Sequence, residues 1–439
     1  MEAGLIGYPF CLRKKERMEK DMPNEKETPH IVVNTLYFLK WSAVSVVLGV
    51  LGGLAGSLFW WGIHWVTGLR GEEPALLFAM PFCGAAIVWM YRTFHEEGNT
   101  GANMVIDSIS SNGKITSATG PLIFFSTLLT HLAGASSGRE GAALQLGGSM
   151  GSVFGKAVGL DEKDLKIATM CGMSAVFAAL FGTPIAAGVF SLEVVSIGVL
   201  YYAALVPCLF SAFTAAAAAE SLGVPPERFP IGQVPEISLA GAGYTVLLGI
   251  LCAVVSVLFC ILLHGSAGLY RRFLKNPYAR ILAGSGIFIV LTLLEGSGEY
   301  MGSGLELIGR ATAAGEARPE AFFLKMLFTS VALGAGFKGG EIVPTLCVGA
   351  TFGCAMGNLL GFCPELSAAC GMAALFVGVT NCPITSLILS LELFGYGGME
   401  YFSIIIAVSF ALSGYYGLYA SQKFAYSKTR TEYINRRSH

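Results

Sequence analysis

The chain of 439 residues consists mainly of long apolar stretches separated by short polar segments. Ten of these stretches are at least 18 residues long and carry at most one charged residue each, and a helix of that length is able to span the hydrocarbon core of a bilayer. They occupy residues 41–69, 74–91, 115–138, 141–160, 167–192, 194–219, 237–270, 342–364, 366–391 and 401–422. The pattern predicts an all-α, polytopic membrane protein.

The composition supports this prediction. Apolar residues make up 54% of the chain and charged residues only 13%, whereas about 25% of the residues in a typical soluble domain are charged. A formal net charge of −1 gives no reason to expect nucleic-acid binding, which requires a basic surface. The eleven cysteines include no Cys-x-x-Cys pair. We interpret them as small buried hydrophobic residues and expect neither a metal site nor a cofactor.

The distribution of charge outside the apolar stretches predicts the orientation. Residues 1–39 form a polar N-terminal segment without the apolar core of a cleaved signal peptide. Residues 423–439 carry five Lys or Arg and one acid, which places the C-terminus in the cytoplasm under the positive-inside rule. The Pro-rich segment 224–239 has a single basic residue and is the best candidate for an extracytoplasmic linker. We expect both termini to be cytoplasmic, and the localisation to be a cell membrane, most simply a bacterial inner membrane.

An internal repeat divides the chain into halves at 40–223 and 240–422. Residues 171–193 align without gaps with residues 370–392, and ten of the 23 positions are identical. With both termini inside and the linker outside, each half crosses the membrane an odd number of times, so the repeats are inverted. Pro184, Pro383 and Gly-rich segments are expected to interrupt helices within the bilayer. Interrupted helices are tolerated there where they line a cavity or bind a ligand, which indicates transport.

The first candidate loop spans residues 134–141 and leads into an apolar helix. A helix N-terminus presents free N–H donors and a partial positive charge, and is therefore suited to an anion. Glu140 can act there as a tethered anion, which fills the site when ionised and leaves it when protonated; the alternative is a simple helix cap. We expect Arg139 to pair internally, with direct contact to an anion as the alternative.

A second loop, residues 336–344, also opens an apolar helix and contains Glu341. Two carboxylates in corresponding loops of a repeat indicate proton coupling, although Glu341 is also able to pair with Lys338. A third loop contains Asn99 and Thr100, whose side chains are possible hydrogen-bond donors to an anion.

With these loops identified, the chain resembles the CLC family of anion channels and proton-coupled antiporters from about residue 40 to 422. The sequence Gly-Arg-Glu-Gly at 138–141 is similar to the family's most specific motif. The resemblance implies a CLC-type fold of two inverted repeats with interrupted and tilted helices, and a homodimer with one pore per subunit. It implies that Glu140 is the gating glutamate and proton carrier, and that Tyr419 faces a central anion. The anion-binding residues it implies are Asn99, Thr100, Gly138, Arg139, Gly141, Gly340, Glu341, Ile342, Val343 and Tyr419.

Several departures from the chloride pattern resemble the bacterial fluoride-exporting branch of the family. Asn99 replaces the selectivity serine, with Thr100 or Asn103 as alternative contacts, and Ile342 stands at the family's Phe position with Glu341 before it. Fluoride is small and strongly hydrated, so its binding needs close N–H and O–H donors. This resemblance implies export of fluoride in exchange for protons.

The inner proton glutamate of chloride antiporters has no counterpart in this chain. Val194 follows Glu193, and Glu193 itself repeats as Glu392, which argues for a structural role of both carboxylates. Glu140 then remains the main proton carrier.

Three other functions are alternatives to fluoride export. A chloride channel or chloride/proton antiporter of the same family is the main alternative. The pattern Gly-x-Ser-x-Gly at 134–138, with His131 nearby, is compatible with an intramembrane serine hydrolase, but such short patterns arise easily in Gly- and Ser-rich helices. A non-conducting scaffold would not need Glu140 and Tyr419. We therefore expect a transporter of fluoride or chloride and protons, embedded in the lipid bilayer, rather than an enzyme.

Overall fold

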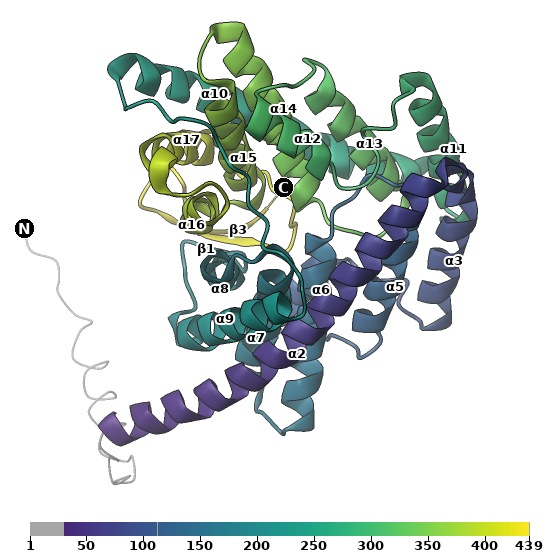
Figure 1. Ribbon diagram of the computed structural model, residues 1–439. Coiled ribbons are helices and arrows are strands. Elements are labelled where there is room, and N and C mark those ends of the chain that lie inside the picture. Colours follow the sequence, from purple (N-terminus) through teal and green to yellow (C-terminus); the bar gives the residue numbers. More distant parts are fainter. Residues whose placement is uncertain (1–29, 112, 439) are drawn as a thin grey trace, which may run out of the picture. The chain divides into compact units, whose positions relative to one another are not determined.

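A computed structural model describes residues 30–111 and 113–438 of the chain and confirms the all-α prediction. Of the described residues, those from Val44 onward form one compact unit, and residues 30–43 belong to a separate one. The helices of the first half are α2 (His30–Glu72), α3 (Met80–Thr93), α4 (Ala102–Ser110), α5 (Thr119–Leu132), α6 (Glu140–Ala157), α7 (Glu162–Phe181), α8 (Pro184–Glu193) and α9 (Leu205–Ser221). Those of the second half are α10 (Leu239–Phe273), α11 (Pro277–Glu295), α12 (Leu305–Gly309), α13 (Ala321–Ala335), α14 (Ile342–Leu360), α15 (Pro364–Thr380), α16 (Pro383–Phe394) and α17 (Met399–Leu412) (Figure 1).

Short one-turn elements link some of these helices. They are the 3₁₀ turns η1 (Pro74–Ala79), η2 (Tyr202–Ala204) and η4 (Tyr396–Gly398), and the π-helical turn η3 (Arg310–Ala314) after α12. Seven spans in the described residues are long and apolar enough to cross a membrane, and several apolar helices are shorter. The fold is therefore a bundle of full-length and partial spans.

The predicted interruptions at the two prolines are present. The apolar stretch 167–192 divides into α7 and α8, and the corresponding stretch 366–391 divides into α15 and α16. Pro184 and Pro383 are the first residues of α8 and α16, a position that suits proline because the first N–H groups of a helix have no partner within it. These breaks produce short helices of ten and 12 residues.

Equivalent helix pairs pack through equivalent glycines in the two halves. Gly147 of α6 faces Gly172 of α7, and a Cβ atom on Gly147 would lie 2.1 Å from the Gly172 carbonyl oxygen. Gly349 of α14 faces Gly371 of α15, where the corresponding distance is 2.4 Å. Any side chain at these positions would force the helices apart. The glycines that repeat in the sequence therefore correspond to the same helix-helix contact in each half.

The two repeated glutamates hold the short helices together. The carboxylate of Glu193, at the end of α8, accepts hydrogen bonds from the N–H groups of Ile384 and Thr385 at 3.1 and 2.8 Å. The carboxylate of Glu392, near the end of α16, accepts hydrogen bonds from Ile185 and Ala186 at 3.0 and 2.8 Å. Each carboxylate thus caps the first turn of the other helix, as the expected structural role requires.

Three short strands were not anticipated. Strands β1 (Ser196–Ile197), β2 (Lys423–Tyr426) and β3 (Tyr433–Arg437) form a sheet in the order β1-β2-β3, with β1 and β2 parallel and β2 and β3 antiparallel. In Figure 1 this sheet is labelled beside α8 and α16. The basic C-terminal segment therefore folds back on the helices as a hairpin.

Candidate functional site

The Gly-rich loops before α6 and α14 meet at a two-residue bridge. Gly138 and Gly340 each donate an N–H to the other's carbonyl oxygen at 2.7 Å, in antiparallel orientation. A Cβ atom on Gly340 would lie 2.6 Å from the Oε2 atom of Glu140 and 2.7 Å from its backbone nitrogen. Glycine is required because the backbones approach this closely, and the bridge directs the N-termini of α6 and α14 to one place.

The carboxylate of Glu140 occupies that place. Glu140 is fully buried and is the first residue of α6. Its Oε1 atom accepts a hydrogen bond from the N–H of Arg139 at 3.1 Å, and its Oε2 atom accepts one from the N–H of Val343, in the first turn of α14, at 3.1 Å. In the described part of the chain it forms no ion pair. A buried carboxyl group is thus held by peptide N–H groups at two helix N-termini, an arrangement that is suited to an anion.

A second carboxylate lies at the same junction. Glu341 directly precedes α14, and its Oε2 atom would be 3.4 Å from a Cβ atom on Gly141, in the first turn of α6. The alternative partner, Lys338, places its Nζ atom 4.5 Å from the centre of the Tyr91 ring and forms no ion pair with Glu341. The structure therefore brings Glu140 and Glu341 together, close enough to interact electrostatically.

Tyr419 has a buried hydroxyl group that makes no hydrogen bond among the described residues. The residue is buried in the loop after α17. It lies within electrostatic range of both Glu341 and Glu140. Buried polar groups in native structures nearly always have a partner, so this hydroxyl fits a site that receives an anion.

The residue that reaches the Tyr419 loop differs from the one expected, and it lies in the first turn of α4. Asn99 uses its side chain locally, accepting a hydrogen bond from the N–H of Gly101 at 2.8 Å and donating one to Glu96 at 3.3 Å, and Thr100 is exposed. Asn103 instead accepts a hydrogen bond from the N–H of Ser421 at 2.9 Å, two residues beyond Tyr419. Of the three alternatives in the sequence, the structure brings Asn103 to the Tyr419 loop.

Arg139 pairs internally, as expected. Its guanidinium group forms an ion pair with Glu227, donates to the carbonyl oxygen of Leu180 at 3.4 Å and lies 5.7 Å from the centre of the Phe181 ring. Its contribution to the candidate site is its backbone N–H, which binds Glu140. The other predicted residues, Gly138, Gly141, Gly340, Ile342 and Val343, likewise contribute backbone at the junction.

One polar residue at the junction was not singled out from the sequence. Gln145, one turn after Gly141, donates its side-chain N–H to the Gly141 carbonyl oxygen at 3.1 Å, and its own Oε1 atom is buried without a partner. The signal was a polar residue among small apolar ones on the first turns of α6. Its position makes it a neighbour of the Glu140 site.

The serine hydrolase alternative is wrong. Ser136 shares a hydrogen bond of 2.9 Å with Thr329, and the ring of His131 contacts the carbonyl oxygen of Gly138 at 3.4 Å. The two side chains do not form a nucleophile-base pair, which such catalysis requires. Among the residues that the structure describes, no cluster of three or more possible metal ligands occurs.

Comparisons with known proteins agree with this geometry. A chloride/fluoride channel protein of Pseudomonas syringae pv. tomato is 33% identical over 399 residues, which cover 89% of this chain and 88% of that protein. The H(+)/Cl(-) exchange transporter ClcA of Yersinia pseudotuberculosis is 24% identical over 410 residues, 87% and 84% of the two chains.

Among solved structures, the crystal structure of a CLC-type fluoride/proton antiporter superposes with a TM-score of 0.85 at 29% identity, over 91% of this chain and 100% of that one. A slow cyanobacterial Cl-/H+ antiporter at 18% identity, with a TM-score of 0.74, supports the fold alone. The model of the voltage gated chloride channel family matches residues 83–414. The chain is therefore a member of this family, the CLC channels and transporters.

Proposed function

We propose that the protein exports fluoride across a cell membrane in exchange for protons. The observation that carries this proposal is the buried carboxylate of Glu140, which is held by N–H groups at two helix N-termini and forms no ion pair among the described residues. A relative described as a chloride/fluoride channel and a similar structure described as a fluoride/proton antiporter support the choice of ion.

The exchange follows from competition for the same donors. While Glu140 is ionised, its carboxylate occupies the N–H groups of Arg139 and Val343. Protonation removes the charge that these donors stabilise, so the neutral side chain leaves and a fluoride ion takes its place. Loss of the proton reverses the step. One protonatable side chain thereby moves an anion and a proton in alternation.

The neighbouring groups fit fluoride. Glu341 brings a second negative charge to the junction, and like charges repel strongly where the dielectric constant is low, so uptake of a proton here relieves repulsion. Tyr419 offers an unpaired hydroxyl and Asn103 an amide beside it. Such small donors are able to replace the tightly held water of fluoride. We propose Asn103, in the first turn of α4, as the side-chain contact in place of Asn99.

Chloride transport is the second candidate, because a chloride/proton exchange transporter is also a relative of this chain. We further propose that both termini are cytoplasmic and that the protein is a homodimer with one pathway per subunit. The basic residues of the C-terminal hairpin support the orientation. Crosslinking of the protein in membranes, followed by denaturing electrophoresis, tests the dimer, and a monomer alone would contradict it.

The test uses purified protein in liposomes, with fluoride efflux and internal pH recorded together. We expect fluoride efflux to drive proton uptake in the wild type, and chloride efflux to be slower. Glu140→Gln should abolish the coupled proton movement. Glu97→Gln is the matched control, because Glu97 is a surface carboxylate paired with Arg92 at 3.2 Å, and it should transport like the wild type. Fluoride efflux without proton movement in the wild type, or unchanged coupling in Glu140→Gln, would contradict the proposal.

A further inference from the structure

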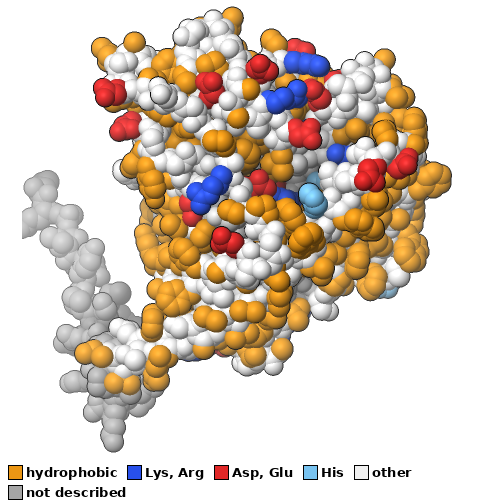
Figure 2. All heavy atoms as spheres, in the orientation of Figure 1, with side chains coloured by type: hydrophobic (Ala, Val, Ile, Leu, Met, Phe, Trp, Pro, Cys, Tyr) orange, Lys and Arg blue, Asp and Glu red, His pale blue; other side chains and the backbone are white. Residues whose placement is uncertain are grey.

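The linker between the two repeats reaches the Glu140 site through one ion pair. The guanidinium group of Arg139, the residue before Glu140, pairs with the carboxylate of Glu227, which lies in the linker 224–239. Figure 1 shows this segment running from the end of α9 to the start of α10 across the face shown, and in Figure 2 acidic and basic side chains lie side by side near the middle of that face. A linker residue therefore determines the charge on the neighbour of Glu140.

The backbone of the linker is fixed on both sides of Glu227. The N–H of Glu227 donates to the carbonyl oxygen of Phe181, the last residue of α7, at 2.9 Å. Pro226 packs against the glycine that ends this helix, where an added Cβ atom would lie 2.3 Å from the proline Cβ. The N–H of Phe229 donates to the carbonyl oxygen of Leu393 in α16 at 3.0 Å. These contacts hold the Glu227 carboxylate at the end of α7.

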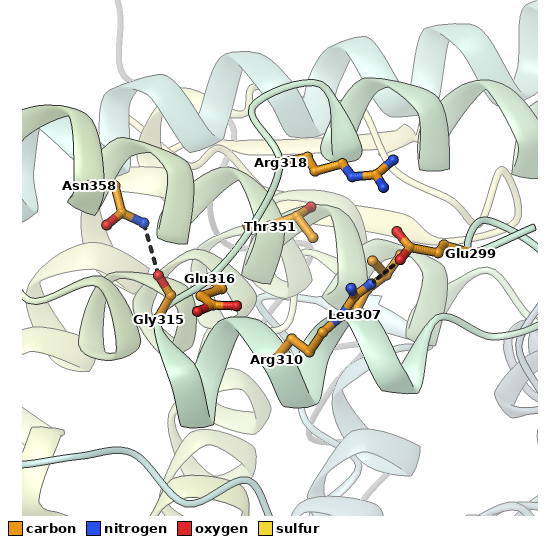
Figure 3. Close-up of a pocket in the computed structure, with 9 residues that line it drawn as sticks. Glu299, Leu307, Arg310, Gly315, Glu316, Arg318, Thr351 and Asn358 are labelled. Atoms are coloured by element: carbon orange, nitrogen blue, oxygen red, sulfur yellow. Dashed lines mark hydrogen bonds and ion pairs between the residues drawn. The ribbon is translucent and has the colours of Figure 1, made fainter. Parts of the chain in front are cut away.

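Burial distinguishes this ion pair from the others among the described residues. The Arg139 side chain is only 8% exposed, and its Nε atom is buried without a hydrogen-bond partner. In the cavity of about 420 Å³ shown in Figure 3, Arg310 pairs with Glu299 at 2.9 Å, but its side chain is 48% exposed. Water and salt screen an exposed pair, whereas a buried cation that loses its partner stays uncompensated. Neutralisation of Arg139 therefore depends on Glu227.

The other charged groups near Arg139 do not replace Glu227. Those that line a cavity with Arg139 or interact electrostatically with Glu140 are Arg70, His131, Glu299, Glu306 and Glu341. Among the described residues, Glu227 is the only acid that forms an ion pair with Arg139, and Glu299 is already paired with Arg310. Arg139 is also within electrostatic range of Glu140. Loss of Glu227 would thus leave an uncompensated positive charge acting on the site.

An exchange mechanism requires the site to hold one negative charge at a time. An ionised Glu140 without an anion and a protonated Glu140 with fluoride carry the same charge, so a fixed charge nearby affects these two states equally. A third state, fluoride together with ionised Glu140, carries two negative charges. An uncompensated cation would stabilise this third state most. Fluoride would then bind without a proton, and the coupling would be lost.

We propose that Glu227 is a positioning residue for coupling, which neutralises Arg139 and thereby keeps fluoride and ionised Glu140 from occupying the site together. This inference rests on the proposed function and adds to it the residue that makes the exchange exclusive. The ion pair compensates the side-chain charge of Arg139 and leaves its backbone N–H to bind Glu140. The linker that joins the two repeats thereby takes part in the exchange step.

The test counts the protons that are taken up as fluoride binds. Purified protein in detergent is titrated with sodium fluoride in weakly buffered solution, with a pH indicator for protons and calorimetry for bound fluoride. At the pH of its maximal uptake, we expect the wild type to take up about one proton for each fluoride ion. Glu227→Gln should take up about half of this or less, and Glu227→Asp, which keeps the charge on a shorter side chain, should fall between the two. Glu236→Gln is the matched control, because Glu236 is an exposed carboxylate of the same linker, and it should behave like the wild type.

Neutralising the other half of the pair separates an effect of charge from an effect on folding. Arg139→Gln leaves Glu227 uncompensated, so we expect full proton uptake but about fivefold weaker fluoride binding. The double variant Arg139→Gln, Glu227→Gln carries neither charge and should return proton uptake to the wild-type value. A purely structural ion pair would give the same loss in both single variants and no recovery in the double variant.

The outcomes also separate this inference from the proposed function. Wild-type protein that binds fluoride without taking up a proton would refute the proposed exchange, and this inference with it. Full uptake by the wild type and by Glu227→Gln alike, or reduced uptake that the double variant does not restore, would overturn the role of Glu227 alone. If Glu227→Gln does not fold, Glu227→Asp and Arg139→Gln decide: wild-type uptake in the first together with wild-type fluoride affinity in the second would overturn the proposal.

Discussion

The carboxylate of Glu140 accepts a hydrogen bond from the N–H of Val343, which lies 203 positions further along the chain in the opposite repeat. This single bond joins the N-termini of α6 and α14 through a group that is able to gain and lose a proton. The Gly138–Gly340 bridge holds the two loops in register around it. The fold therefore uses its internal repeat to build one site from two halves.

Gly340→Ala should disrupt this site while leaving the helices folded. The added methyl group would lie 2.6 Å from Glu140 Oε2 and 2.7 Å from the backbone nitrogens of Glu140 and Gly141, so the carboxylate has to leave its donors. We expect proton-coupled fluoride transport in liposomes to fall at least tenfold. Gly286→Ala, where an added Cβ meets open space, is the control. Normal coupled transport by Gly340→Ala would show that this contact is not part of the site.

Tyr419→Phe should separate binding from stability. The hydroxyl is buried without a partner, so its removal costs the folded state nothing and relieves an unsatisfied group. We expect the unfolding temperature in detergent to stay the same or rise, while fluoride affinity falls about fivefold, the equivalent of one hydrogen bond of about 1 kcal/mol. A lower unfolding temperature with unchanged fluoride affinity would show that the hydroxyl group contributes to packing and not to anion binding.

Asn103 and Asn99 make a matched pair for testing selectivity. Asn103 contacts the Tyr419 loop through Ser421, whereas Asn99 closes a local turn with Gly101 and Glu96. We expect Asn103→Ala to reduce the preference for fluoride over chloride in efflux assays. Asn99→Ala should leave the ratio of the two rates unchanged. The opposite pattern would return the selectivity role to Asn99.

The difference between these two asparagines shows where sequence reasoning reaches its limit. Asn99 stands in the Gly-rich loop and Asn103 in the first turn of α4, so a shift of four positions changes which side chain meets the Tyr419 loop. Which asparagine reaches the Tyr419 loop depends on where α4 begins, and it begins at Ala102. No local sequence pattern predicts the first residue of this helix to within one turn. The backbone of the candidate site was predictable, because Gly138, Gly340 and their neighbours combine a repeat with helix N-termini.

The fold likewise has parts that the sequence predicts and parts that it does not. The breaks at Pro184 and Pro383 were predictable because proline and the repeat both mark them. The C-terminal hairpin was not, since its strands have only four and five residues and the first of them pairs with a distant segment, β1. In the sequence Arg70 resembles an ordinary interfacial residue at the end of a long span, and only the three-dimensional arrangement shows that its guanidinium group reaches the carbonyl oxygen of His131.

Glu193 and Glu392 each cap the first turn of the helix that carries the other, so we expect their substitution to affect stability and not transport. Glu193→Gln and Glu392→Gln each weaken charge-assisted hydrogen bonds to the first turn of the opposite short helix. We expect each change to lower the free energy of unfolding by about 1–2 kcal/mol, seen as a lower unfolding temperature in detergent. The ratio of protons to fluoride ions transported should not change in either variant. A changed ratio in Glu193→Gln alone would instead make Glu193 an inner proton carrier.

The contacts of Lys428 in the C-terminal hairpin predict that docking of the hairpin depends on pH. Its Nζ atom donates to Asn381 at 2.5 Å, to Ser413 at 3.0 Å and to the carbonyl oxygen of Phe410 at 3.1 Å. Asn381 in turn donates to the carbonyl oxygen of Tyr416 at 2.9 Å, in the loop that carries Tyr419. Lys428 thus joins the hairpin, which lies outside the membrane-spanning helices, to the candidate site.

Burial lowers the pKa of Lys428 from its usual value of 10.5 to about 7. Between pH 7 and 10.5 a released hairpin binds a proton that the docked hairpin does not, so docking becomes more stable as the pH rises through this window and is constant below it. We expect amide hydrogen-exchange protection factors of residues 423–438 to increase from pH 7 to pH 9. Lys428→Met should abolish this increase, and Lys423→Met, which removes one long hydrogen bond of 3.5 Å to Ser110, should retain it. Protection that falls with rising pH, or an equal slope in Lys428→Met, would show that the docked lysine keeps its proton.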